Sequence, residues 1–229
     1  MKHVYKTYDA LEVSVHALNN VSLSIEKGEV VVVLGASGGG KTTLLNCLSG
    51  LDTATKGTIL YNGQDLTKLS DRKITKFRKD HLGFIFQTYN LLEHLNVYEN
   101  VLVGAKLGHR KVNIDEIIET VGLTPHKHKY MHELSGGEQQ RVSIARALAK
   151  EPEIMFCDEP TGALDEKTGK VVLETLIEAN EKFNTTMLII THNPGIAAIG
   201  DRVIRMNSGC IVEDVKNKKR TKPSDISWG

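Results

Sequence analysis

The nine residues GASGGGKTT, from Gly35 to Thr43, constrain this chain more than any other stretch of its sequence. Five apolar residues, 30–34, stand before them, and the run LLNCL follows them. A loop that only turns the chain needs one or two glycines, whereas a loop that wraps its own N–H groups around a ligand needs several close together. The stretch therefore predicts an anion-binding loop between a buried strand and a helix.

The stretch also satisfies the P-loop pattern G-x-x-x-x-G-K-[ST], from Gly35 to Thr42. In a P-loop, backbone N–H groups and a helix N-terminus hold phosphates, the lysine reaches the β- and γ-phosphates, and the hydroxyl binds Mg²⁺. We therefore expect Lys41 to be catalytic and Thr42 to be a metal ligand. The expected nucleotide-binding residues of the loop are Gly35, Ser37, Gly38, Gly39, Gly40, Lys41, Thr42 and Thr43.

A second motif, IMFCDEP at 154–160, ends an apolar strand in two carboxylates. Phosphoryl transfer at a P-loop needs a carboxylate that holds the metal and a group that orients the attacking water. We expect Asp158 to bind Mg²⁺ and Glu159 to act as the general base. An acidic pair at a strand end is usually only solvated, so its significance here depends on the P-loop that precedes it.

Composition limits the partners that the chain can have. The net charge of +1 over 229 residues offers no overall field for gathering nucleic acid or anionic lipid. The three cysteines form no C-x-x-C pair and are typical of reduced thiols in a cytosolic protein. No apolar run approaches the roughly 18 residues that span a bilayer, and the N-terminal residues lack a signal-peptide core. A membrane role would therefore need a separate partner chain.

Apolar patterning predicts an α/β fold with a mostly parallel sheet, because short buried strands alternate with helices. The expected parallel-type strands are 29–34, 83–87, 154–157 and 187–191, and the expected antiparallel edge strands are 4–8, 13–25 and 57–61. The expected helices are 41–49 and 167–183, an amphipathic helix near 114–121, and one that begins at Ser135 and ends before Pro152. Residues 88–150 are mainly helical and interrupt the sheet as a subdomain.

The segment LSGGEQQR at 134–141 carries the resemblance to a family. Its S-x-x-E pattern predicts a capping box, but a capped helix does not explain Gly136 and Gly137, which are unfavourable in a first helical turn. The segment resembles the signature sequence of ABC-transporter ATPases, and it lies between the P-loop and the acidic pair, as it does in that family. The resemblance implies that Ser135, Gly136, Gly137 and Glu138 form a second phosphate-binding surface for ATP.

The resemblance covers nearly the whole chain and implies a P-loop NTPase with a RecA-like core, an antiparallel β edge subdomain and an inserted α-helical subdomain. We expect a single domain over 1–229, with the core and β edge at 1–87 and 151–215 and the helical signature subdomain at 88–150. Residues 216–229 are expected to form a C-terminal tail. Its basic part, 216–222, either touches lipid headgroups beside a membrane partner or is disordered.

Further site residues follow from the same resemblance. Gln87 matches the Q-loop glutamine, which touches Mg²⁺ or the attacking water, and Asp165 matches the D-loop aspartate. His192 matches the switch histidine that contacts the γ-phosphate. Tyr8 matches the aromatic residue that stacks on adenine, although Tyr5 is a rival and a strand tyrosine can simply pack on the core.

In this family two subunits pair head to tail, and each ATP lies between one P-loop and the other subunit's signature. The segments GFIFQTYNLL at 83–92 and EPTGALD at 159–165 resemble the branch that contains MacB and LolD. That branch drives permeases with large extracytoplasmic domains in peptide export, antimicrobial-peptide resistance or lipoprotein release. The resemblance implies a homodimer at the cytoplasmic face of the membrane, where Tyr89, Leu91 and Leu92 line a groove for a permease helix.

Two other readings of the motifs stay open. A soluble ABC ATPase acting on nucleic acid or ribosomes is disfavoured by the single set of motifs and the near-zero net charge, so we expect no nucleic-acid partner. A regulatory subunit with little catalysis is disfavoured because every catalytic position is filled. Three histidines, His126, His128 and His132, lack a partner carboxylate or cysteine at metal-ligand spacing, and we expect them to lie in a solvated loop.

Overall fold

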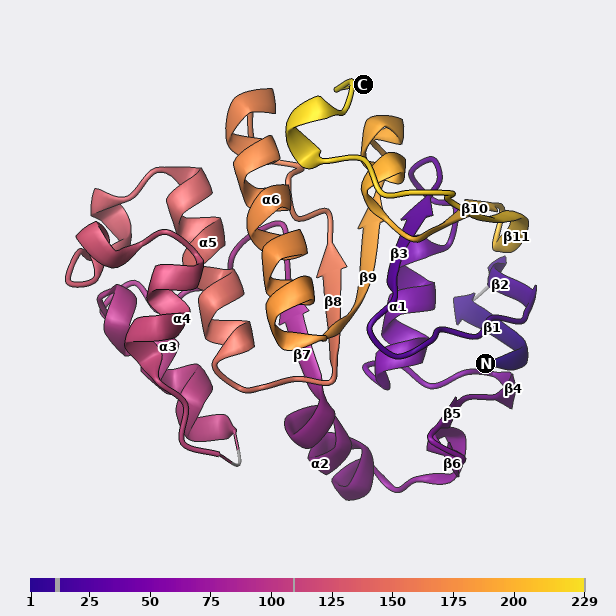
Figure 1. Cartoon of the computed structure of the whole chain (residues 1–229). Helices are drawn as coiled ribbons and strands as arrows, with labels where there is room; N and C mark the ends of the chain where they lie inside the picture. The colour runs from indigo at the N-terminus through magenta and orange to yellow at the C-terminus, as the bar shows by residue number, and fades with distance from the viewer. Residues whose placement is uncertain (11–12, 109, 229) are drawn as a thin grey trace.

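The computed structural model describes residues 1–10, 13–108 and 110–228, and its centre is a six-stranded sheet (Figure 1). The strand order is β11-β10-β3-β9-β8-β7, and only β10 and β11 pair antiparallel. The strands are β3 Val30–Leu34, β7 Leu82–Ile85, β8 Ile154–Asp158, β9 Thr186–Thr191, β10 Arg202–Asn207 and β11 Cys210–Lys216. This order confirms the predicted α/β fold with a mostly parallel sheet.

Both faces of this sheet are covered, so its central strands are apolar throughout. Along β3, Val30 and Val32 pack into one hydrophobic cluster, and Val31 and Val33 pack into another. The first cluster contains side chains of α5 Gly136–Leu148 and α6 Glu166–Phe183, and the second contains those of α1 Lys41–Ser49 and the β edge. The three cysteines are free thiols, of which Cys47 and Cys157 are buried.

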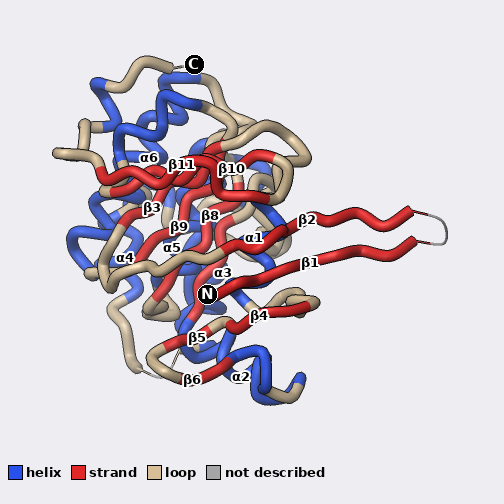
Figure 2. Tube along the Cα trace, turned by 90° about the vertical axis from the view of Figure 1, so that its right-hand side faces the viewer, coloured by secondary structure: helices blue, strands red, loops and turns tan. Residues whose placement is uncertain are grey.

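The antiparallel β edge has the order β2-β1-β4, with β1 Lys2–Ala10, β2 Val13–Val21 and β4 Lys56–Thr58. In Figure 2, β1 and β2 form a long hairpin that projects from the body of the molecule. A short pair, β5 Leu60–Tyr61 and β6 Gln64–Asp65, follows the edge, and η1 Leu66–Lys68 comes next. The second strand ends at Val21 rather than near residue 25, because Leu23 instead exchanges hydrogen bonds with Met1.

The helical subdomain predicted for 88–150 contains α3 Val97–Leu107, α4 Ile114–Thr120, α5, and the short turns η2 Thr124–His126 and η3 Met131–Glu133. It lies on the side of the sheet opposite the β edge (Figure 1). The apolar stripe of α4 points inward as predicted, since Ile117 and Ile118 are buried. Before β7, α2 Asp71–His81 buries only Phe77.

The C-terminal region differs from expectation. We did not predict β10 and β11, and Lys216 is the last residue of β11. Residues 217–228 fold back over η4 Pro194–Ile199 and α6, with a final turn, η5 Pro223–Asp225 (Figure 1). The Arg220 guanidinium pairs with Asp201, and the Trp228 ring lies against Gly169 of α6. The disordered alternative for this segment is therefore wrong.

Candidate nucleotide site

The P-loop joins the end of β3 to the start of α1, and its backbone makes the helix N-terminus accessible to a ligand. Gly40 caps α1 with φ +94, and a Cβ there would lie 2.5 Å from the Ala17 carbonyl oxygen. Only glycine fits a left-handed residue at such a close approach. The N–H groups of the first turn of α1 have no intrahelical partners, so they can bind phosphate.

The Lys41 side chain lies inside this loop and is 7% exposed. Its ammonium donates to the carbonyl oxygens of Gly35, at 2.8 Å, and Ala36, at 3.0 Å. These two bonds satisfy the buried charge and hold it beside the first turn of α1. The ammonium therefore lies where phosphate oxygens bound by the helix N-terminus would meet it.

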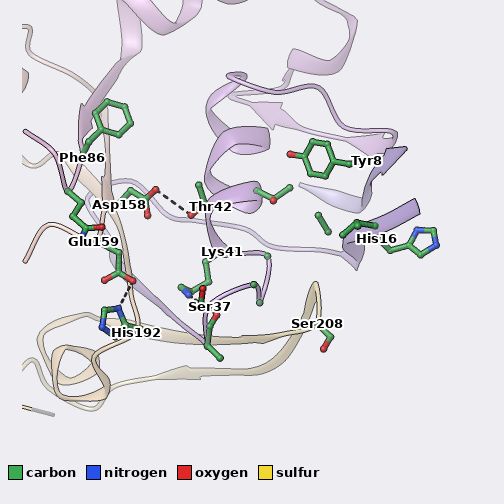
Figure 3. A pocket seen from close by; sticks show the side chains of 18 of the residues that line it. Tyr8, His16, Ser37, Lys41, Thr42, Phe86, Asp158, Glu159, His192 and Ser208 are labelled. Carbon is green, nitrogen blue, oxygen red and sulfur yellow. Dashed lines mark hydrogen bonds and ion pairs between the residues drawn. The ribbon is translucent and has the colours of Figure 1, made fainter. Parts of the chain in front are cut away.

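A cavity of about 1090 Å³ opens above the loop, and Figure 3 shows the side chains around it. Most of the predicted site residues line this cavity, namely Tyr8, Ser37, Gly38, Gly39, Gly40, Lys41, Thr42, Thr43, Gln87, Asp158, Glu159 and His192. The lining residues that sequence reasoning missed are Val15, His16, Ala17, Ala36, Phe86, Thr88 and Ser208. Gly35 forms the base of the loop and is not among the lining residues.

The Thr42 hydroxyl faces the Asp158 carboxylate across the cavity, with Oγ1 donating to Oδ2 at 3.4 Å (Figure 3). Burial and the nearby Glu159 charge raise the pKa of Asp158, and Thr42 and Lys41 oppose that rise only in part. A cation between these groups would remove that unfavourable burial of negative charge. The hydroxyl, the carboxylate and the Gln87 amide oxygen are the hard ligands that Mg²⁺ prefers. The residues present therefore fit Mg²⁺ bound jointly by the protein and nucleotide phosphates.

No cluster of three or more His, Cys, Asp or Glu side chains within the described residues could hold a metal without such a nucleotide. This agrees with the usual behaviour of Mg²⁺, which one or two carboxylates and substrate phosphates bind.

Glu159 follows the last residue of β8 in a left-handed conformation, with φ +49. This conformation is uncommon for a residue with a side chain and is often found at functional sites. A bond from its N–H to the Ile190 carbonyl, at 2.9 Å, fixes the turn against β9. The carboxylate Oε1 lies 2.9 Å from His192 Nδ1, and Oε2 is buried without a hydrogen-bond partner among the described residues (Figure 3).

Of the two tyrosines proposed for adenine, Tyr8 lines the cavity and Tyr5 does not. The Tyr8 hydroxyl donates to Asp52 at 2.7 Å, and the Lys6 ammonium lies 4.7 Å from the ring centroid. Tyr8 is 41% exposed, so an aromatic base can still stack on its ring. His16 reaches the same cavity because β2 pairs it with Thr7, a register that no local sequence signal reveals.

The signature residues start α5 outside this cavity. Ser135 is the N-cap, its hydroxyl accepts from the Glu138 N–H, and the Glu138 carboxylate accepts from the Ser135 N–H at 2.7 Å. The capping box predicted from the sequence is therefore confirmed. Burial opposes ionisation of Glu138, but the Ser135 bonds and the charge of His126 outweigh it and lower its pKa. His126 Nε2 lies 3.0 Å from Glu138 Oε1, so this histidine is not a purely solvated loop residue.

The two signature glycines permit close packing. A Cβ on Gly137 would lie 2.0 Å from Cγ2 of Thr168, and a Cβ on Gly136 would lie 2.9 Å from the Tyr89 hydroxyl. Asp165, the D-loop residue, caps α6 and accepts from the Thr168 N–H and hydroxyl, and it does not line the cavity. The signature and the D-loop therefore form one packed unit outside the cavity of their own chain.

A glycine loop with a buried lysine, next to a strand that ends in Asp158 and Glu159, defines a P-loop nucleoside triphosphatase. Residues 18–162 match the sequence profile of the ABC transporter family. The chain is 42% identical, over 91% of its length and 85% of the relative's, to the bacitracin export ATP-binding protein BceA of Halalkalibacterium halodurans. It is 46% identical, over 88% of its length and 32% of the relative's, to the macrolide export ATP-binding/permease protein MacB of Campylobacter jejuni.

Another relative is the putative ABC transporter ATP-binding protein MG065 homolog of Mycoplasma pneumoniae, 44% identical over 100% of this chain. This chain spans only 50% of that protein. Among solved structures, the dimeric post-hydrolysis cassette MJ0796 bound to ADP and Pi matches with a TM-score of 0.85 and 36% identity, over 95% of this chain and 98% of that one. The chain therefore belongs to the ABC transporter family, as an ATP-binding cassette of the MacB-like branch, and ATP hydrolysis is the activity of this class.

Proposed function

We propose that the chain works as a head-to-tail homodimer that hydrolyses two ATP molecules and drives a separate membrane permease. The observation that supports this proposal is the split of the predicted site. The P-loop, Asp158, Glu159 and His192 gather around the cavity, whereas Ser135 and Asp165 lie outside it. ATP in the cavity therefore needs the α5 N-terminus of a second copy to complete its surroundings.

Within that dimer, the residues around the cavity divide the work of hydrolysis. Lys41 and the start of α1 hold the β- and γ-phosphates, and Thr42, Asp158 and Gln87 hold Mg²⁺, which offsets the phosphate charge. The Glu159 carboxylate takes a proton from the attacking water, while the oxygen of that water bonds to the γ-phosphorus and the bond from the γ-phosphorus to the β–γ bridging oxygen breaks. His192 holds Oε1 of the same carboxylate. The products are ADP and phosphate.

The proposed permease is of the MacB/LolD type, with a large extracytoplasmic domain. The similarity to BceA and MacB supports export of peptides or antimicrobials, or resistance to them, and lipoprotein release is the other activity of this branch. Within the described residues, no helix has the length and apolar character needed to cross a membrane. We place the chain at the cytoplasmic face of the membrane, bound through its permease.

The proposed contact with the permease is the surface at Tyr89, Leu91 and Leu92. Leu92 is 46% exposed and available to a partner, while Leu91 packs partly against the core. Tyr89 connects this surface to the signature, because its hydroxyl lies over Gly136. A permease helix bound to this surface would therefore press on the residues that complete the partner's ATP site.

Co-purification tests this proposal. Tagged protein would be recovered from detergent-solubilised membranes of its own host, and ATPase activity would be measured on the product. Recovery of an integral membrane protein with stimulated hydrolysis is the expected result. Recovery of only soluble proteins or nucleic acid would overturn the membrane assignment and leave the ATP chemistry intact.

A further inference from the structure

A buried glutamine connects the signature helix to two parts of the nucleotide site. Gln140 lies in α5 and is 0% exposed. Its Nε2 donates to the Pro160 carbonyl at 2.8 Å and reaches the Phe86 carbonyl at 3.4 Å. Pro160 follows the general base Glu159, and Phe86 precedes Gln87. One side chain therefore bridges the signature helix, the acidic-pair loop and the Q-loop.

The orientation of this amide is fixed by its partners. Carbonyl oxygens only accept hydrogen bonds, so the nitrogen of Gln140 must face Pro160 and Phe86. The remaining Oε1 is buried and has no hydrogen-bond partner among the described residues. A buried acceptor without a partner is unfavourable by about as much as one or two good hydrogen bonds contribute. The amide therefore adds little net stability, and its two donated bonds need another explanation.

Two further contacts join the same parts of the chain. The Gln87 amide nitrogen lies 3.0 Å from the position of a Cβ on Gly162, two residues beyond Pro160. The Gly162 N–H donates to the Glu159 carbonyl at 3.0 Å and closes the turn that carries the general base. Gln140 holds the first part of this turn, and Gln87 packs against its end.

From this arrangement we infer that Gln140 is a positioning residue for ATP hydrolysis. It links the orientation of the signature helix to the positions of Glu159 and Gln87, so that both copies align when the dimer closes. It does so through the backbone of Pro160 and Phe86 and does not itself line the cavity. The inference rests on the hydrolysis proposed above.

The test compares wild type with Gln140→Met, a side chain of similar length that removes the two donated bonds and the unpartnered oxygen together. We expect kcat at saturating ATP to fall on the order of tenfold, because misplacing a reacting group slows the chemical step. Gln140→Asn keeps an amide but is one methylene too short to span the same gap, and it should lose kcat in the same way.

A second measurement tests the effect of Gln140 on dimer formation directly. In a Glu159→Gln background, ATP-dependent dimerisation is followed by analytical ultracentrifugation, and binding of a fluorescent ATP analogue to the monomer is measured separately. Gln140→Met should weaken the ATP-bound dimer and leave monomer binding unchanged. If Gln140 served folding alone, Gln140→Met would lower the unfolding temperature but change neither dimerisation nor nucleotide binding by the monomer.

Asn180→Leu serves as the matched control. This buried amide also donates to two carbonyl oxygens, of Gly28 and Thr185, but none of these residues lines the nucleotide cavity. The Asn180→Leu variant should have a lower unfolding temperature and an unchanged kcat. Wild-type kcat in Gln140→Met would overturn the inference alone, whereas a wild-type chain that hydrolyses no ATP, even beside its permease, would overturn the proposed function.

Discussion

Glu159 and His192 face each other across the ends of two neighbouring strands, with Oε1 of the glutamate 2.9 Å from Nδ1 of the histidine. This contact uses one carboxylate oxygen and leaves Oε2 buried without a partner among the described residues. A general base needs an oxygen that is fixed in place yet able to accept a proton. The proposed role of Glu159 as general base therefore depends on this contact, which fixes the carboxylate in place.

Replacing the general base should stop turnover without preventing ATP binding. Glu159→Gln keeps the shape of the side chain but cannot take the proton, and we expect kcat to fall by about 10²–10⁴-fold. The variant should also accumulate as an ATP-bound dimer on size-exclusion chromatography. Glu213→Gln, which removes a half-exposed carboxylate of β11, is the control. Turnover by Glu159→Gln at the wild-type rate would rule out this role.

Replacing the proposed metal ligand Asp158 should stabilise the folded chain and weaken its Mg²⁺-dependent activity. Burial and the Glu159 charge raise the pKa of Asp158 in the folded chain. Ionised Asp158 therefore destabilises the folded state at every pH above the ordinary aspartate pKa. This destabilisation disappears at low pH, where the carboxyl is protonated in both the folded and the unfolded chain. Asp158→Asn should therefore raise the melting temperature at pH 7 but not at low pH. The same variant should need more Mg²⁺ for ATP hydrolysis, and a chelator should stop hydrolysis in wild type. A lower melting temperature at pH 7 would contradict the electrostatic argument.

The close packing of Gly137 against Thr168 predicts that a second substitution can compensate for a larger residue at position 137. Gly137→Ala gains about 1 kcal/mol of helix propensity, but its methyl group meets Cγ2 of Thr168, and such overpacking typically destabilises by about 1–3 kcal/mol. We expect a net loss of stability and of ATPase activity. Thr168→Ser removes that Cγ2 and keeps the hydroxyl bonded to Asp165, so the double variant should recover most of both. Urea unfolding and ATPase assays measure the stability and the activity of the single and double variants. A double variant that recovers neither would contradict the contact between residues 137 and 168.

The folded-back C-terminal segment should stabilise the chain through Arg220. Arg220→Ala removes its two bonds to Asp201 and one to Asn180, and we expect a loss of about 1–2 kcal/mol. Burial raises the pKa of Asp201, but the Arg220 bond outweighs it and lowers the pKa overall. This contribution is therefore complete above the ordinary aspartate pKa and is lost as the pH falls through the lowered value. Urea unfolding at pH 7 and at low pH tests the difference, and exposed Lys219→Ala is the control.

Local motifs made the P-loop, the acidic pair and the capping box predictable, because each of them is a short sequence with its own physical signature. The same holds for the buried strands β3, β8 and β9, which are continuous apolar runs. The strand β10 was missed because Arg202 and Arg205 interrupt its short apolar run, and its parallel partner is the distant β3. His16, His126 and Gln140 likewise acquire their roles from contacts far along the chain, which no single-sequence pattern encodes.

Because the signature lies outside the cavity of its own chain, the effective concentration of the second copy would set how often an ATP site of the proposed dimer is complete. In dilute solution two free copies must meet by diffusion, so activity per molecule should rise with protein concentration. A permease that holds two copies side by side raises their local concentration to the order of millimolar without adding any contact to the ATP site. The membrane partner would thus act as a tether that converts a bimolecular encounter into an intramolecular one.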